Sequence, residues 1–283
     1  MEQAVQMADK ADVILLVLGG SGMNSGGIGW GEDGVEDEVT SGEGFDSVDI
    51  RLPEVQMELA KRILDIGKPV VLILEDGRPC AIPELYDRAE AVVQAWYPGN
   101  EGGRALAEIL FGRVNPSAKL TVSIPKHVGQ IPMCYNHKPS ARGFYHKPGT
   151  PEKPGRDYTT MDPSPYYEFG YGLSYTEFAY SNLQIKVKGR QAEISVDVEN
   201  AGEMEGKEVV QVYINDMVSS VTTPVKELKA FQKIDLKPGE KRTVIFVLGE
   251  ESLSLIDKDM NRVMEPGWFE VYIGNLKEKF YMQ

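Results

Sequence analysis

Apolar positions in the first half of the chain follow the rhythm of alternating strands and helices. Residues 13–18 form a continuous aliphatic run that ends at Gly19 and Gly20, which is the pattern of a strand buried on both faces. A helix is predicted to begin at Pro53, because proline suits a first helical turn, and to close before Gly67. Its inward residues are expected to repeat every four positions, at Val55, Leu59 and Ile63.

The same alternation continues to residue 124. Residues 69–75, 91–96 and 119–124 are predicted strands, and residues 101–112 are a predicted helix that stops at Gly112. The residues of this helix expected to face inward are Ala105, Leu106, Ile109 and Leu110. Strands that alternate with helices at this spacing predict a mostly parallel sheet covered by helices, which is an α/β sandwich.

Periodicity disappears between residues 125 and 172, a stretch too long for an ordinary connection and therefore expected to be functional. All three histidines, His127, His137 and His146, lie here. None stands at the three- or four-residue spacing that would turn two ligands toward one ion, so no metal site is expected.

After Ser174 the apolar residues alternate in twos. Residues 192–200, 208–216, 243–249 and 268–274 show this pattern and are separated by turn-forming compositions. We therefore predict an α/β domain over residues 1–173 and an all-β sandwich over residues 174–283. The sandwich shows no cluster of acids, histidines or aromatic residues along the sequence, so a scaffold role is expected.

Charge and cysteine content narrow the functional classes. The formal net charge of −13 argues against nucleic acid and anionic membranes as partners. No apolar run reaches the ~18 residues of a membrane span, and residues 1–12 do not resemble a signal peptide, so the chain is either cytoplasmic or preceded by a leader. Cys80 and Cys134 share no metal-ligand spacing and are predicted to be free, buried thiols.

Two glycine- and acid-rich stretches suggest cofactors but fit them poorly. "GGSGMNSGGIG" follows a strand as a nucleotide-binding loop would, yet the third position of that motif is not glycine or alanine and no helix opens there. "GEDGVEDEV" lacks the residue order of a calcium-binding loop. No cofactor is expected.

Glu43 is the strongest candidate for a catalytic carboxyl. Glycines on both sides allow close approach of a ligand, and Asp46 follows. The alternative for such a residue, taken alone, is a solvated surface charge. The wider pattern decides between the two.

Six stretches in sequence order carry a family resemblance. They are "SGEGFDSVDIRLPEVQMELA", "GKPVVLILEDGRP", "VVQAWYPGNEGGRALAEILFGRVNPSAKLTVSIP", "PYYEFGYGLSYTEF", "GKEVVQVYIND" and "PVKELKAFQKIDLKPGE". Together they resemble the C-terminal region of family 3 glycoside hydrolases, the β-glucosidase and β-xylosidase family. The resemblance implies an α/β sandwich with a mostly parallel sheet, followed by an all-β, immunoglobulin-like sandwich of the fibronectin type III-like kind.

The resemblance also implies that Glu43 is the general acid/base of a retaining glycosidase acting on terminal β-linked sugars. In the family pattern an arginine stands where this chain has Ser47, and a glycine where it has Ala118. A retaining enzyme needs two carboxyl groups about 5–5.5 Å apart. The family's nucleophile is an aspartate in a Ser-Asp-Trp or Ser-Asp-Tyr setting on a (β/α)8 barrel, and this chain contains neither tripeptide.

The expected partners are therefore a β-linked oligosaccharide or glucoside and a barrel supplied in cis or in trans. The resemblance places Arg142, Tyr145, His146 and Lys147 in a segment that borders the cleft, as candidate substrate or barrel contacts. Trp96 and Tyr97 are expected either to stack on sugar or to pack under the helix that opens at Glu101. Two alternative functions remain: a non-catalytic carbohydrate-binding or assembly module, and a flavodoxin-like nucleotide binder.

Overall fold

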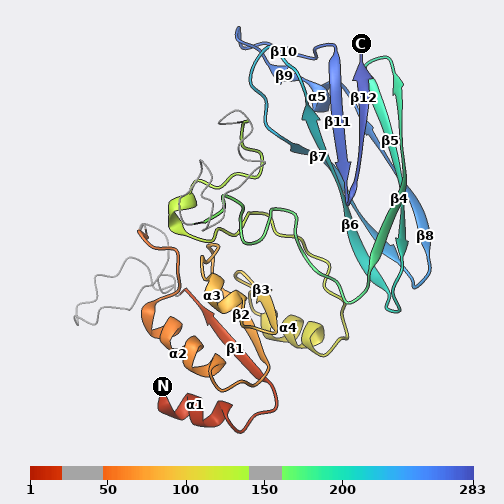
Figure 1. Ribbon diagram of the computed structural model, residues 1–283. Coiled ribbons are helices and arrows are strands. Elements are labelled where there is room, and N and C mark those ends of the chain that lie inside the picture. The colour runs from red at the N-terminus through yellow and green to blue at the C-terminus, as the bar shows by residue number, and fades with distance from the viewer. Residues whose placement is uncertain (21–46, 140–160) are drawn as a thin grey trace. The chain divides into compact units, whose positions relative to one another are not determined.

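The computed structural model describes residues 1–20, 47–139 and 161–283 (Figure 1). Two compact units divide them. The first, called the α/β unit, comprises Met1–Leu106, Ile124–Pro132 and Pro165–Tyr167. The second, called the β-sandwich unit, comprises Ala107–Ser123, Met133–Ser164 and Glu168–Gln283. No helix in the described ranges combines the length and the apolar content that crossing a membrane would require.

Three parallel strands form the sheet of the α/β unit, in the order β1-β2-β3. Their register places Ile14 opposite Val70 and Val71 opposite Ala91. The strands are β1 (Ile14–Gly19), β2 (Val70–Glu75) and β3 (Ala91–Gln94). The parallel pairing confirms the predicted α/β class.

Helices precede, connect and follow these strands along the chain. They are α1 (Glu2–Ala8), α2 (Glu54–Leu64), the short α3 (Pro83–Tyr86), α4 (Gly102–Leu110) and a 3-10 turn, η1 (Val128–Gln130). α1 lies alongside α2, where Arg62 and Glu2 form an ion pair (Figure 1). The division between the two units falls within α4, after Leu106.

The buried stripe of α2 differs from the predicted one. Met57, Ala60 and Ile63 are 0–2% exposed, whereas Val55 is 65% exposed. The buried row follows an i, i+3 spacing, so the predicted four-residue repeat is right at Ile63 and wrong at Val55, while Leu59 is half-buried. Pro53 precedes the first helical residue as expected, and Gly67 follows the helix with φ of +76°.

β1 is not buried on both faces, which corrects the sequence prediction. Leu16 and Leu18 are buried, but Val13, Leu15 and Val17 are each more than half exposed. In the described chain β1 pairs with β2 alone and one of its faces is open. A continuous aliphatic run predicts a strand, but it does not predict which of the strand's two faces is covered.

Two further predictions near residue 120 are wrong. Residues 119–123 are not a strand, because their backbone bonds go to a later loop: the N–H of Leu120 donates to the carbonyl of Tyr171 (2.8 Å), and that of Gly170 donates to Leu120 (2.7 Å). Ala105 of α4 is exposed, and Leu106, Ile109 and Leu110 are only half-buried. Gly112 does end this helix, with φ of +70°.

Antiparallel strands make up the β-sandwich unit, as predicted. One sheet has the order β12-β11-β6-β7, a second β4-β5-β8, and β9 and β10 form a small ribbon. The strands are β4 (Phe178–Lys188), β5 (Gln191–Asn200), β6 (Gly206–Asp216), β7 (Glu227–Leu236), β8 (Lys241–Leu248), β9 (Leu255–Ile256), β10 (Arg262–Val263), β11 (Gly267–Ile273) and β12 (Leu276–Met282), with a single helical turn, α5 (Glu250–Leu253), after β8.

The core of this unit is built from alternate residues of the two sheets. Ala192, Ile194, Val196 and Val198 of β5 are all 0% exposed. Such alternation is expected when one face of each sheet packs on the other and the opposite face meets water.

A partly buried ion pair holds the segment after α4 to this sandwich. The ammonium group of Lys119 lies 3.2 Å from the carboxylate of Glu208 and donates to the carbonyl of Gly172 (2.8 Å). The hydroxyl of Tyr180 also donates to Glu208 (2.9 Å). Both partners of the Lys119 ammonium group belong to the β-sandwich unit, so this lysine has a structural role there.

Candidate functional site

All five site residues predicted from the sequence lie outside the described residues. Glu43 belongs to residues 21–46, and Arg142, Tyr145, His146 and Lys147 belong to residues 140–160. The site is therefore built from the described residues that flank the first of these segments. These residues gather at the carboxyl ends of β1, β2 and β3.

The carboxyl edge of a parallel sheet is where ligands of open α/β folds bind. In this chain β1 leads to Gly20, β2 to Asp76 and β3 to Trp96. Because the strands run in the same direction, these three ends lie along one edge. This edge is the candidate functional site.

Gly19, the last residue of β1, is held by a side chain of α2. Its N–H donates to Oε1 of Gln56 (3.0 Å), and Nε2 of Gln56 donates to its carbonyl (2.8 Å). A Cβ at Gly19 would lie 1.8 Å from the carbonyl oxygen of Glu75, so only glycine fits this position. The next N–H, of Gly20, donates to the same carbonyl (3.2 Å).

The described chain resumes at Ser47 and is fixed again within a few residues. The carbonyl of Ile50 accepts from the N–H of Ala81 (3.0 Å), and Leu52 is 4% exposed. Both flanks of the segment that carries Glu43 are thus attached to the α/β unit.

Asp49 is an ionised partner of Arg51 rather than an acid. Hydrogen bonds from the side chain and the N–H of Arg51 hold the pKa of Asp49 below its usual value. A general acid must keep its proton until it meets the substrate, so a lowered pKa disfavours this role.

The end of β2 is closed by local hydrogen bonds. The carboxylate of Asp76, 7% exposed, accepts from the N–H of Arg78 (2.9 Å). Burial raises the pKa of the nearby Cys80 thiol to about 12, and the Asp76 carboxylate adds to the shift. Cys80 is therefore an unreactive thiol.

The cysteine prediction is confirmed in part. Cys80 and Cys134 are both free, and Cys80 is buried as expected. Cys134 is exposed, which corrects the prediction for that residue. It lies in the aperiodic stretch, where apolar content gave no separate indication of burial.

Aromatic and amide side chains mark the end of β3. Trp96 has φ of +54°, an unfavourable value for a residue with a side chain. Tyr97 is 62% exposed, and its ring lies so close to Gly77 that a Cβ there would approach within 2.7 Å. The alternative in which Tyr97 packs under a helix is therefore wrong. Nε2 of Gln94 is buried and has no acceptor within the described part of the chain.

Metal ligands do not gather here. Nδ1 of His127 accepts from the N–H of Gly129 (3.0 Å), which caps η1. Over the residues that the structure describes, no group of three His, Cys, Asp or Glu side chains is placed to hold an ion.

Sequence reasoning missed Gln56, Asp76 and Gln94. Asp76 and Gln94 could have been found, because each is a polar residue at the end of a predicted parallel strand. Gln56 gave no signal, since it reads as an ordinary polar position of an amphipathic helix. Its role depends on the distance between α2 and β1, which only the folded chain shows.

Comparison with known families divides the chain in two. Residues 1–175 match the model of the glycosyl hydrolase family 3 C-terminal domain, and residues 208–277 match that of a fibronectin type III-like domain. Both agree with the order of the α/β and all-β parts.

Individual proteins are similar over nearly the whole chain. A periplasmic beta-glucosidase of Salmonella typhimurium is 40% identical over 97% of this chain, and a beta-xylosidase of Formosa agariphila is 37% identical over 96%. The crystal structure of a beta-glucosidase from Listeria innocua in complex with isofagomine superposes with a TM-score of 0.83 at 36% identity, covering 100% of this chain and 38% of that one. The chain spans 34–35% of the two curated relatives, about a third of their length.

Proposed function

This chain belongs to glycosyl hydrolase family 3, and from this we propose that it supplies the general acid/base, Glu43, to a retaining β-glycosidase. The observation that carries the proposal is the family match over residues 1–175, which includes the glycine-flanked carboxyl at Glu43. The nucleophile would come from a (β/α)8 barrel, in cis or in trans.

The attachment of the flanking residues supports this role. Gly19 and Gly20 are bonded to Gln56 and Glu75, and Ile50 is bonded to Ala81. The described residues on both sides of the segment that carries Glu43 are therefore fixed to the α/β unit. The ionised state of Asp49 also removes one competing acid from this edge.

The chemistry proceeds in two steps. In the first, the barrel's carboxylate attacks the anomeric carbon and the glycosidic C–O bond breaks, while the Glu43 carboxyl protonates the departing oxygen; the aglycone leaves as an alcohol and a glycosyl-enzyme remains. In the second, the Glu43 carboxylate takes a proton from water, which attacks the same carbon and releases the sugar. The chain alone lacks the nucleophile for the first step and is expected to be inactive without the barrel.

The finer assignments extend this proposal. The substrate is a terminal β-linked glucose or a related sugar, as the names of the relatives suggest. Arg142, Tyr145, His146 and Lys147 contact the substrate or the barrel. The domain boundary lies near residue 173, which is supported by the end of the first family match at residue 175.

Complementation tests the proposal directly. The purified chain is assayed on an aryl β-glucoside alone and with a family 3 barrel added in trans. We expect hydrolysis only in the mixture. Substantial turnover by the chain alone contradicts the incomplete-enzyme interpretation, and no gain on mixing favours the non-catalytic module.

Substitution then identifies the acid. With the barrel present, Glu43→Gln should slow cleavage of natural substrates at least ~100-fold, the scale of lost general acid/base help. Azide should partly restore the turnover of substrates with good leaving groups. It can attack the glycosyl-enzyme in place of water, and as an anion it does not need a general base to remove a proton. The matched control is Glu36→Gln in the same acidic stretch, which should stay active; the reverse result makes the assignment wrong.

A further inference from the structure

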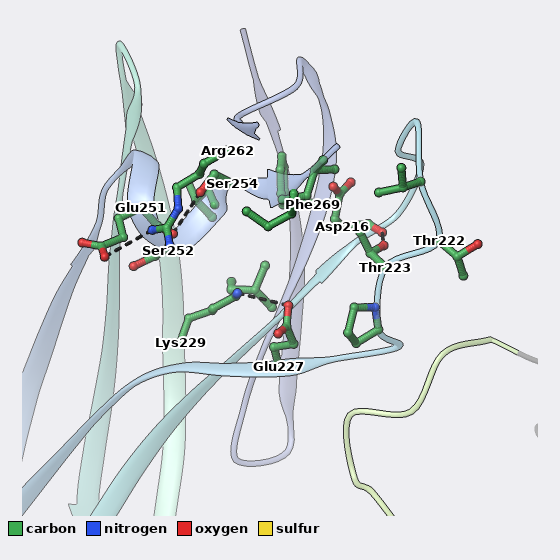
Figure 2. A pocket seen from close by; sticks show the side chains of 16 residues that line it. Asp216, Thr222, Thr223, Glu227, Lys229, Glu251, Ser252, Ser254, Arg262 and Phe269 are labelled. Atoms are coloured by element: carbon green, nitrogen blue, oxygen red, sulfur yellow. Dashed lines mark hydrogen bonds and ion pairs between the residues drawn. The ribbon is translucent and has the colours of Figure 1, made fainter. Parts of the chain in front are cut away.

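A cavity of about 310 Å³ lies in the β-sandwich unit, beside the connection from β6 to β7 (Figure 2). This is at the lower end of the ~300–1,000 Å³ found for small-molecule sites. Three parts of the unit build it: the end of β6 with the following connection and the start of β7, the α5–β10 region, and β11. The lining residues are Ile214, Asp216, Val221, Thr222, Thr223, Pro224, Glu227, Lys229, Glu251, Ser252, Leu253, Ser254, Leu255, Ile256, Arg262 and Phe269.

Apolar side chains of the sandwich core form one part of the wall. Ile214, Leu253 and Phe269 are 2–4% exposed and belong to the main hydrophobic cluster. Because the core holds them, this surface is rigid. The apolar atoms that a ligand can reach belong to the half-buried side chains that cover this surface, Val221 and Leu255.

Hydroxyl groups form a second part of the wall. The hydroxyl of Thr223 donates to the backbone carbonyl of Asp216 (3.3 Å), and that of Ser254 donates to the carbonyl of Glu251 (3.1 Å). A hydroxyl that donates one bond keeps lone pairs to accept others. Thr222 and Ser252 add two more hydroxyls to the lining.

The charged groups of the wall are largely paired with one another. Lys229 lies 3.0 Å from Glu227, and Arg262 lies 3.2 Å from Glu251, as the dashed lines of Figure 2 show. Asp216 is the remaining carboxyl, so the lining carries three acids against two bases. This balance disfavours an anion as the ligand.

Asp216 provides the polar anchor. Burial raises the pKa of this carboxyl to about 6, and the neighbouring Glu265 carboxylate adds to the shift. A partly desolvated carboxylate gains from any additional hydrogen-bond donor, because water no longer supplies enough of them. No three-acid metal cluster occurs among the described residues, so donor groups are a better match than a cation.

We propose that this cavity binds a neutral mono- or disaccharide, whose hydroxyls donate to Asp216 and exchange hydrogen bonds with the paired side chains and the Thr and Ser hydroxyls. The carbon face of the sugar packs on the accessible apolar side chains of the lining, Val221 and Leu255. Mixed donors and acceptors beside a hydrophobic surface are what a polyhydroxylated ring requires. This inference is independent of Glu43, since the cavity lies wholly in the β-sandwich unit.

The test measures sugar binding to the full 283-residue chain, by titration calorimetry and by saturation-transfer NMR. Glucose, xylose and cellobiose are the probes, and calcium chloride and inorganic phosphate are run in parallel. We expect saturable binding of at least one sugar and none of the two ions. Absence of saturable sugar binding, or binding of an ion in its place, overturns the proposal.

Four variants, controls included, locate the site. Asp216→Asn removes the charge at constant size and should weaken sugar binding at least tenfold; the matched control is the exposed Asp235→Asn, which should not. Thr222→Ala, at an exposed position, should weaken binding several-fold and keeps the test valid if Asp216→Asn alters folding. Binding lost in Glu43→Gln but kept in Asp216→Asn would place the sugar elsewhere and contradict the proposal.

Discussion

β1 and β5 are both rich in aliphatic residues, yet the fold treats them differently. In β5 every second residue is fully buried between two sheets, and the alternate residues are polar or half-exposed. In β1 both sets of alternate residues are aliphatic, but only Leu16 and Leu18 are buried, while Leu15 and Val17 are more than half exposed. The sandwich strand completes its core within its own unit, whereas the parallel strand leaves one apolar face open among the described residues.

This difference indicates where each unit obtains its stability. An open row of large aliphatic side chains on a strand marks a surface that gains free energy when covered. The β-sandwich unit is therefore expected to be stable by its own packing. The α/β unit is expected to gain more than the sandwich from whatever covers β1.

The largest expected effect tests the contrast between these two strands. Ile194→Ala removes a fully buried side chain from β5 and should lower the free energy of unfolding by about 2–5 kcal/mol. Leu15→Ala on β1 should cost less than about 1 kcal/mol, because much of this side chain already meets water. Hydrogen exchange followed by mass spectrometry reads the two units separately. If the two substitutions lower the free energy of unfolding by equal amounts, the open face of β1 is covered in solution.

A second prediction concerns the partly buried ion pair of the β-sandwich unit. Lys119→Met leaves the Glu208 carboxylate without its ammonium partner, and we expect a loss of about 2–3 kcal/mol, below the full cost of breaking a wholly buried pair. Adding Glu208→Gln should recover part of it. Thermal denaturation of the single and double variants measures both, and no recovery would show that the lysine acts through Gly172 alone.

The third prediction is a pH dependence confined to the sandwich. The pKa of Asp216 is raised to about 6 in the folded state, against about 4 in the unfolded chain, so folding favours the protonated form. Its contribution to stability is therefore present at pH 4 and is lost as the pH rises to 6. Asp216→Asn cannot ionise, so its stability relative to the parent should increase by about 1 kcal/mol over this window.

Urea denaturation at pH 4.5 and pH 7.5 measures this difference. The exposed Asp235→Asn serves as the control and should show no such trend. A parent chain that gains stability relative to Asp216→Asn as the pH rises would contradict the burial of this carboxyl.

The smallest effect is expected in the α/β unit. Gln94→Met replaces a buried amide nitrogen that has no acceptor in the described ranges by an apolar chain of similar length, and should raise stability by about 0.5–1 kcal/mol. The melting temperature of the α/β unit reports the change. A decrease would mean that Gln94 bonds to a group beyond the described residues.

Local pattern was sufficient for most elements of the fold. The two-residue alternation of residues 192–200 and 208–216 predicts β5 and β6, because a half-buried strand requires it. The run 69–75 likewise predicts β2. In these cases the constraint on each residue comes from its own strand and its immediate neighbours.

Where long-range pairing decides, the pattern failed. Residues 119–123 carry strand-like composition, but their hydrogen bonds go to residues near 170, about 50 positions away. The cavity beside the β6–β7 connection was also missed, since its lining residues Asp216, Glu251 and Arg262 are separated in sequence and come together only in the folded sandwich. A ten-residue connection after β6, rich in Ser and Thr, was the one available signal. Glu43 and the residues near 145 stay predictions.

The two hydrogen bonds between Gln56 and Gly19 give a side-chain amide the position that a peptide group of a neighbouring strand would otherwise occupy. The position of Gly19, the last residue of β1, is therefore fixed by α2 as well as by its pairing with β2. Any sliding or rotation of α2 must carry Gly19 with it or break both bonds at once. Since Gly20 is the last described residue before residues 21–46, α2 helps to fix the position of the chain immediately before them.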